Sequence, residues 1–322
     1  MIKILSYSRV FSFKHISTRA RQSCNHLRRF SEMAEAYVPP EVWTMAELGQ
    51  LASNASQNLP TSGARTEKEL PVGKHPIQVY ALATPNGQKV NIMLEELLDA
   101  GVKEAEYDSH LINIGQGDQF TSGFTAVNPN GKIPCILDQS VTPPQRVFES
   151  GHILLYLAEK YGRFIPTEPA KRTETLNWLF WAHGATPLLG GGFGHFWKYA
   201  PEKMKYCLNR FTMEIKRQMD VLDKQLEKNK FIAGDEFTIA DIAAWTYYGN
   251  LVLDRLYPNA AKFVDAESYI NLQRWAKEMK ERKGVTRGYI VNRPWGEAYE
   301  KCPERHCPDD IDSVLAQAPT DC

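Results

Sequence analysis

The sequence contains 322 residues, of which 43% are apolar, and this length is sufficient for two domains with a sizeable core. Its 38 lysines and arginines balance 38 aspartates and glutamates, so the formal charge is zero and a nucleic-acid-binding protein is disfavoured. No run of 18 apolar residues is present, and we therefore expect no membrane span. The six cysteines include no C-x-x-C motif, which excludes a small secreted disulfide scaffold and favours a soluble, reduced, intracellular protein.

The charge is unevenly distributed along the chain. Residues 1–32 contain seven basic residues and one acid, which gives +6, whereas the remaining 31 basic and 37 acidic residues give −6. A segment rich in arginine and serine and poor in acids is typical of an organelle transit peptide. We therefore expect residues 1–32 to direct the protein to a mitochondrion or another organelle. If translation instead starts at Met33 and the upstream residues are an extended start, we expect a cytoplasmic protein.

Residues 33–75 are predicted to form an N-terminal arm with little regular structure. Prolines and glycine interrupt it, among them Pro39, Pro60 and Gly63. A weak helix is indicated only at Thr44, because Thr44 and Glu47 have the spacing of a capping box.

The segment 76–163 has the pattern of an α/β thioredoxin-like domain. An alternating, β-rich stretch is followed by a turn, by apolar residues at helical spacing as far as Gly101, and by a second short strand, which together indicate a βαβ unit. Two closely connected strands and a helix complete the domain. The expected strands are 77–82, 106–111, 135–138 and 146–148, and the last helix opens at residues 149–151.

The segment 170–292 is predicted to be an all-α domain, followed by a tail at 293–322. Thr238 and Asp241 have the spacing of a capping box at the start of one helix, and another helix is expected at about 266–281. Two further helices each bury one apolar face, formed by Leu176, Leu179, Phe180 and His183 in the first and by Phe211, Ile215, Met219, Leu222 and Leu226 in the second.

At this point the sequence resembles the glutathione S-transferase superfamily and, within it, the nu class, from about Tyr37 to about Asp309. A single tetrapeptide of this kind is a weak signal, but many of them occur in order over most of the chain. The stretches that carry the resemblance are 70–76, 84–89, 117–120, 132–134, 148–151, 189–196, 233–235 and the capping box at 238–241. The resemblance implies that the thioredoxin-like domain binds glutathione, that a subunit binds two glutathione molecules, and that the protein is a homodimer.

The helix that opens at Ser150 is a candidate site for a glutathione carboxylate. A helix N-terminus has unpaired amides and a partial positive charge, to which Ser150 adds a hydroxyl, and Glu149 can hold the glutathione ammonium. From the residues alone, Ser150 is better explained as an N-cap, with Glu149 merely favouring the helix dipole. The resemblance favours the glutathione site.

Asn86 and Thr84 are the candidate catalytic residues. Donors aimed at a sulfur stabilise the thiolate, and Asn86, the Thr84 hydroxyl and nearby helix-terminal amides can donate. The alternative is that Asn86 and Gly87 after Pro85 simply form a good turn. The chain offers no tyrosine, serine or cysteine at this place.

Ile133 precedes Pro134, and on sequence alone this pair marks the start of an edge strand. The resemblance implies instead a cis Pro134, which leaves the Ile133 backbone free to pair with the cysteinyl part of glutathione. Cys135 follows in a strand that reads as buried, so we expect it to serve in packing rather than in chemistry.

The resemblance carries over to individual residues. Arg210 would offer a fork to a glutathione carboxylate, although it also reads as an ordinary surface charge. His183 departs from the family pattern, in which glutamine is usual, so a second glutathione site here is expected to differ in affinity or pH response. The expected glutathione-binding residues are Asn58, Thr84, Pro85, Asn86, Gln119, Lys132, Ile133, Glu149, Ser150, His183 and Arg210.

The function implied is glutathione-dependent reduction of small disulfides, with both thiols supplied by glutathione. The alternatives are a glutathione transferase or peroxidase and a non-enzymatic regulatory protein of the same fold. We expect small-molecule thiols and disulfides as partners, and neither nucleic acid nor a membrane. Two cysteines and one histidine between Cys302 and Cys307 are too few for a structural zinc site, so we expect no metal.

Overall fold

The computed structural model describes residues 38–47 and 58–319. The chain divides into two compact units, Met1–Asn54 and Ala55–Cys322. In the first unit the weak helix expected at Thr44 is a single 3-10 turn over residues 45–47, closed by a bond from the Glu47 amide to the Thr44 carbonyl (3.1 Å). The expected transit peptide lies outside the described residues. All that follows concerns the second unit.

A four-stranded sheet forms the first half of this unit, in the order β2-β1-β3-β4. The strands are β1 (Ile77–Ala81), β2 (Tyr107–Leu111), β3 (Cys135–Asp138) and β4 (Gln145–Phe148). Strands β1 and β2 are parallel and joined by a helical crossover, whereas β3 and β4 are antiparallel to their neighbours. This arrangement confirms the predicted thioredoxin-like domain.

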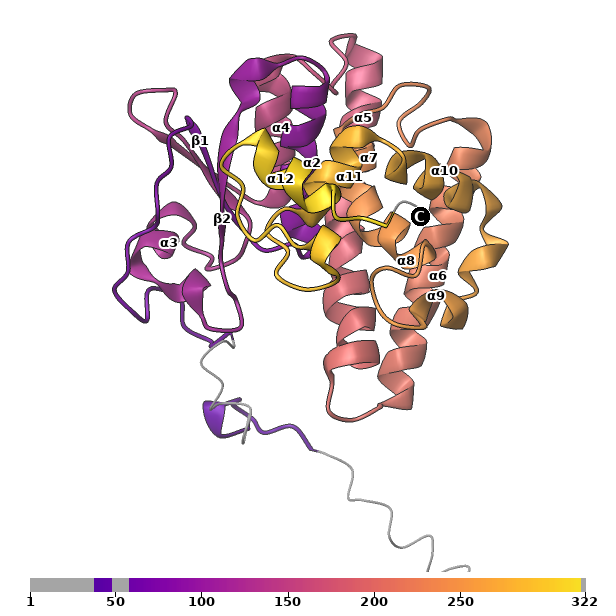
Figure 1. The fold of residues 1–322 in the computed structure, drawn as a ribbon. Helices are drawn as coiled ribbons and strands as arrows, with labels where there is room; N and C mark the ends of the chain where they lie inside the picture. Colours follow the sequence, from indigo (N-terminus) through magenta and orange to yellow (C-terminus); the bar gives the residue numbers. More distant parts are fainter. Residues whose placement is uncertain (1–37, 48–57, 320–322) are drawn as a thin grey trace, which may run out of the picture. The chain divides into compact units, whose positions relative to one another are not determined.

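Alternation along β1 gives each face of the sheet its own core. Ile77, Val79 and Ala81 point into the large core shared with α2 (Pro85–Asp99) and α4 (Ser150–Tyr161). Tyr80 points to the opposite face, where a smaller cluster contains Phe124 of α3 (Ser122–Val127). Figure 1 shows α3 on one side of the sheet and α2 with α4 on the other.

The second half of the unit is helical, as predicted, and packs on α2. Helix α5 continues directly into the π-helix η4, which packs against α6 (Figure 1). The helix expected at 266–281 is divided into a 3-10 turn and α10. The helical elements are α5 (Pro169–Pro187), η4 (Leu188–Tyr199), α6 (Lys205–Lys228), α7 (Ile239–Ala244), η5 (Trp245–Gly249), α8 (Asn250–Val252), α9 (Ala260–Phe263), η6 (Ala266–Ser268), α10 (Ile270–Lys280), α11 (Lys283–Ile290), η7 (Ala298–Glu300) and α12 (Pro308–Leu315), with η2 (Lys103–Ala105) and η3 (Asp118–Phe120) in the first half.

Two details of the helical half test the sequence analysis. The capping box of Thr238 and Asp241 is present at the start of α7, as predicted. Phe180, in contrast, was wrongly placed on the buried face of α5: it is 66% exposed, whereas Leu179 beside it is buried. Because adjacent residues on a helix point about 100° apart, only one of the two can face this core.

The C-terminal segment is more than a tail. Arg305 forms a bridge with Ser109 at the free edge of β2, with bonds of 2.8 and 3.1 Å between their backbones, and its side chain is buried. Figure 1 shows this segment, in yellow, beside β2 and α11. It therefore covers an edge that would otherwise be open. No helix in the described part of the chain is long and apolar enough to cross a membrane.

Candidate glutathione site

The first turn of α2 presents Asn86. Thr84 is the N-cap, because its hydroxyl accepts from the Gly87 amide (3.5 Å), and Pro85 occupies the first helical position, where its missing N–H costs nothing. The Thr84 hydroxyl lies 3.5 Å from the Leu82 carbonyl. Residues 84–87 thus form a turn and at the same time place Asn86 at the start of α2. The interpretation of this motif as a turn is therefore compatible with Asn86 as a hydrogen-bond donor.

Lys89, one turn further along α2, is the centre of the site. It is 0% exposed, and its Nζ donates to Asn86 Oδ1 (2.9 Å), approaches Ser150 Oγ at 3.4 Å and approaches His183 Nε2 at 3.4 Å. Burial lowers the pKa of Lys89 to about 7, while the charge of Glu149 acts in the opposite direction. Three of the predicted glutathione-binding residues are therefore joined by one amine that the sequence analysis did not single out.

The N-terminus of α4 is open toward this amine. Glu149, not Ser150, is the N-cap, and no described side chain caps the helix, so the N-cap reading of Ser150 was wrong. Glu149 has φ 70° and ψ 116°, a backbone conformation that non-glycine residues rarely adopt and that is often retained at functional sites. Ser150 is buried, and its hydroxyl faces Lys89 and His183.

His183 reaches the site from α5. Its ring lies against the backbone of Gly151, where a Cβ atom would come within 2.6 Å of it. Nδ1 donates to the Leu179 carbonyl (2.8 Å), which leaves Nε2 as the acceptor facing Ser150 and Lys89. Burial and the nearby Lys89 lower the pKa of His183 to about 4. This value favours the neutral ring at physiological pH, and the altered affinity or pH response of a second glutathione site stays a prediction.

A second group of predicted residues lies around the loop before β3, which carries Lys132 and Ile133, whereas Gln119 belongs to η3 and Asn58 to the segment ahead of β1. Lys132 Nζ donates to Asn58 Oδ1 (2.6 Å), and both line a hollow of about 310 Å³. Gln119 is buried and donates to the Ile114 carbonyl (3.4 Å). The bond between Ile133 and Pro134 is cis, as the resemblance implied, and the ladder with β1 begins only at Cys135.

The structure also locates Arg210 and Cys135. Arg210 is exposed on α6, and its charge helps to lower the pKa of Glu214, after the hydrogen bonds that this carboxylate accepts from Arg217 and Gln218; its role toward glutathione stays a prediction. Cys135 is fully buried, and burial raises its pKa strongly. A thiol held in its protonated form is a poor nucleophile, which agrees with the packing role expected for it.

Sequence reasoning missed Lys89 and Tyr247. The available signal for Lys89 was its place three residues after Asn86, which puts both side chains on one face of the helix. Tyr247, on η5, had no such signal. Its ring centroid lies 5.3 Å from Lys89 Nζ, and burial raises its pKa to about 12, although a hydrogen bond from the Asn86 side chain acts to lower it.

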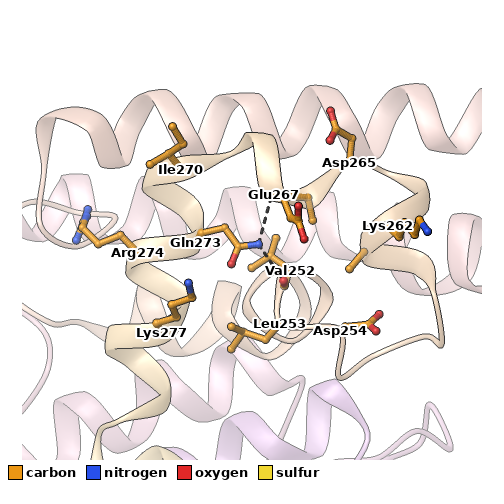
Figure 2. Close-up of a pocket in the computed structure, with 12 residues that line it drawn as sticks. Val252, Leu253, Asp254, Lys262, Asp265, Glu267, Ile270, Gln273, Arg274 and Lys277 are labelled. Atoms are coloured by element: carbon orange, nitrogen blue, oxygen red, sulfur yellow. Dashed lines mark hydrogen bonds between the residues drawn. The ribbon is translucent and has the colours of Figure 1, made fainter.

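Other hollows of the unit differ in character. Thr84 and Pro85 also line a hollow of about 360 Å³ whose walls include Tyr199, Tyr257 and Arg255. A larger one, of about 920 Å³, lies among α8, α9 and α10 and contains none of the predicted site residues. Figure 2 shows its wall, where Gln273 donates to the carbonyls of Val252 (3.0 Å) and Ala266 (3.2 Å).

A cluster at the edge of β2 holds possible metal ligands. His110, Glu304 and His306 offer atoms within 4.8 Å of one another. Three of their four ring nitrogens have oxygen partners, since both nitrogens of His306 face carboxylates, of Asp108 (2.8 Å) and Glu304 (3.1 Å), and His110 Nε2 faces Gln78 (2.8 Å). Neither Cys302 nor Cys307 belongs to the cluster. We interpret it as the polar contact that fixes the C-terminal segment on the sheet.

The family follows from comparison with known proteins. The family models "Glutathione S-transferase, N-terminal domain" and "Glutathione S-transferase, C-terminal domain" match residues 76–159 and 205–278. The chain is 61% identical over 277 residues to the Escherichia coli protein named disulfide-bond oxidoreductase YghU, covering 86% of this chain and 96% of that one. The chain belongs to the glutathione S-transferase family.

Solved structures of other family members carry glutathione. A glutathione transferase from Streptococcus pneumoniae, complexed with glutathione, is 57% identical to this chain and has a TM-score of 0.76. The match covers 79% of this chain and 97% of that one. A transferase from Burkholderia graminis, with two glutathione molecules bound per subunit, is 37% identical with a TM-score of 0.61, covering 67% of this chain and 88% of that one.

Proposed function

We propose that this protein is a glutathione-dependent disulfide-bond reductase. The observation that carries the proposal is the convergence of Asn86, Ser150 and His183 on the buried amine of Lys89, next to the uncapped N-terminus of α4. The likeness to the E. coli disulfide-bond oxidoreductase, over nearly the whole of that protein, supports the reaction.

The residues of the site match the chemical groups of glutathione. The first amides of α4 and the Ser150 hydroxyl suit a carboxylate, because a helix N-terminus carries a partial positive charge. The exposed carboxylate of Glu149 suits the ammonium. Ile133, ahead of the strand ladder, offers its backbone to the cysteinyl peptide, and Lys132, beside it on the same loop, is bonded to Asn58.

Asn86 is the proposed catalytic donor, with Thr84 holding its turn. A hydrogen bond from the carboxamide to the sulfur stabilises the thiolate relative to the thiol, which increases the nucleophile present at neutral pH. Reduction of a disulfide RSSR′ consumes two glutathione molecules and yields RSH, R′SH and glutathione disulfide, so it needs no protein thiol. The protein supplies proximity and a lowered thiol pKa.

The hollow beside Thr84 is the proposed place for the second thiol or the disulfide substrate. Aromatic side chains of Tyr199 and Tyr257 and the guanidinium of Arg255 line it together with Pro85. Such a surface suits a molecule that combines apolar and carboxylate groups. Two glutathione molecules per subunit, as in the Burkholderia protein, would fill both places.

The test is reduction of a small disulfide at millimolar glutathione, followed as glutathione disulfide formation. We expect saturable turnover and loss of most activity in Asn86→Ala, since removal of one hydrogen-bond donor that stabilises a developing charge, as in an oxyanion hole, costs about 100-fold or more. Conjugation and peroxide assays run beside it rank the alternative activities. An absence of disulfide reduction by the wild-type protein refutes the proposal, and binding of glutathione without any turnover favours the regulatory alternative.

We also propose that the protein is a homodimer. Phe180 on α5 and Met213 on α6 are 66% and 63% exposed, and large apolar side chains of this kind often mark an interface. Light scattering is expected to give twice the mass of the chain. Phe180→Glu is expected to shift the population toward monomer, and a monomeric wild type contradicts the proposal.

We propose, finally, that residues 1–32 act as an organelle transit peptide, supported by their seven basic residues and one acid. N-terminal sequencing of protein from its own cells is expected to begin near residues 30–34. Intact Met1 together with purely cytosolic fractionation would contradict this.

A further inference from the structure

Lys89 is an amine buried without a carboxylate partner. Its side chain is 0% exposed, and within the described residues no carboxylate oxygen lies within the 4.0 Å of an ion pair with it. Burial of an unpaired ammonium is costly by several kcal/mol, and proteins usually avoid it with a smaller or apolar residue. A negatively charged ligand beside Lys89 would therefore offset the free-energy cost of burying its charge, which no ion pair within the described residues offsets.

The groups that face Lys89 come from four elements and are almost all neutral. Asn86 of α2, Ser150 of α4 and His183 of α5 contact the amine, and the ring of Tyr247 on η5 lies over it. His183 is neutral above about pH 5, since its pKa is about 4. Glu149 is the charged group that acts on Lys89, and it is exposed at the start of α4.

The bond to Asn86 fixes the orientation of the carboxamide. Lys89 donates an N–H to Asn86 Oδ1 whether its amine is charged or neutral, so the amide nitrogen of Asn86 is turned toward the other side. One N–H of that nitrogen is directed to the Tyr247 hydroxyl. The second N–H is left for a ligand, a few ångströms from the amine.

Resting on the proposed function, we infer that Lys89 accepts the proton of the bound glutathione thiol and, as an ammonium, faces the resulting thiolate together with Asn86. The S–H bond breaks, its electron pair remains on sulfur, and the proton passes to Lys89 Nζ. No oxidant or further reactant is involved. The step forms a buried ion pair from two neutral groups, and Asn86, held by the same amine, donates to the sulfur.

A lysine with its ordinary pKa is protonated at neutral pH and cannot accept a proton, but burial lowers the pKa of Lys89 to about 7. A buried amine of this kind is partly unprotonated near neutral pH and can take up a proton. An opposite charge within about 4–6 Å lowers the pKa of an acid by about 1–3 units. The thiolate and the ammonium stabilise each other by the same amount.

The experiment titrates the ultraviolet absorbance of the thiolate of glutathione bound to the full-length protein. Lys89→Met removes the amine at similar length, and Lys89→Gln keeps a hydrogen-bond donor for Asn86 but cannot take up a proton. Both variants are expected to raise the thiol pKa by about one unit or more and to lower kcat/KM at pH 7 about tenfold or more. The Gln variant is expected to lose less activity than the Met variant, because Asn86 keeps its orientation.

Lys216→Met is the matched control. Lys216 lies on α6, its amine donates to the Val264 carbonyl (2.7 Å), and it also lies over a tyrosine ring, that of Tyr269 (5.3 Å). Its replacement is expected to leave the thiol titration unchanged. A Lys89 variant that binds glutathione and titrates like the wild type overturns the inference. Disulfide reduction need not occur for this readout, so its failure would refute only the proposed function.

A second measurement uses the wild-type protein alone and does not depend on a variant that folds. Calorimetry at pH 8 in buffers of different ionisation enthalpy counts the protons released when glutathione binds, relative to S-methylglutathione. Transfer of the thiol proton to Lys89 predicts a net release near zero. Formation of a bound thiolate with release of about one proton to the buffer would overturn the inference.

Discussion

Asp241 provides the sharpest test of how this fold is stabilised. Its carboxylate is 0% exposed, where Oδ1 accepts from the Ile232 amide (2.9 Å) and Trp275 Nε1 (3.0 Å) and Oδ2 from the Thr238 amide (3.0 Å). Burial nevertheless dominates these bonds and raises the pKa of Asp241 to about 6, from 3.8. We predict that Asp241→Asn changes both the stability and its dependence on pH.

The magnitude follows from the two pKa values. A folded-state pKa above the unfolded value means that the native state binds the proton more tightly, so the contribution of Asp241 is present below about pH 4 and is lost as pH rises through about 6. A shift of about two units at 1.36 kcal/mol each corresponds to about 3 kcal/mol. Asparagine removes this dependence, but its amide faces the Thr238 amide, a pair of donors that costs about 1–3 kcal/mol at every pH.

Urea unfolding at steps from pH 4 to pH 8 measures the effect. The contributions of all other titrating groups cancel in the difference between wild type and Asp241→Asn. We expect the advantage of the wild type to fall by about 2–3 kcal/mol across this range. A difference that is constant, or that grows with pH, would refute the reasoning about burial.

Three further predictions concern packing and chemistry. Gly288→Ala is expected to destabilise the protein by about 1–3 kcal/mol, because its Cβ would come within 2.4 Å of the Ile92 amide where α11 packs on α2. Gly191→Ala is the control: a Cβ there meets nothing within 4 Å, so the midpoint of unfolding is expected to change little. Cys135→Ser is expected to retain at least half of the disulfide reductase activity, since burial keeps this thiol protonated, and a loss above tenfold in a folded variant would contradict the proposed source of both thiols. His183→Gln is expected to leave the pH dependence of glutathione binding between pH 6 and 8 unchanged, because the pKa of about 4 keeps the ring neutral there; a displaced profile would show that the ring does titrate.

Local features of this protein were predictable because their physical causes are local. The alternation of Ile77, Val79 and Ala81 indicates a strand with one buried face, and the structure places all three in the core. Thr238 and Asp241 form their capping box within a single turn, so four residues of sequence contain both partners.

The contacts that assemble the site are not local. Lys89 is three residues from Asn86 but 61 from Ser150 and 94 from His183, so no short window of sequence contains the amine together with all the groups that face it. Lysine is usually a surface residue, and the packing of α4, α5 and η5 over α2 buries Lys89. Its lowered pKa is a consequence of that burial, which a sequence pattern does not record.

The sequence by itself determined the order of elements, the fold class and the family, because periodicity, turn chemistry and short motifs are properties of neighbouring residues. It also showed that the zero net charge is the sum of +6 over the first 32 residues and −6 over the remainder. Only the tertiary structure decided that Phe180 is exposed, that Arg305 closes the edge of β2, and that Lys89 is the centre of the site. Each of these depends on which surfaces meet, and distant segments meet only when the whole core forms.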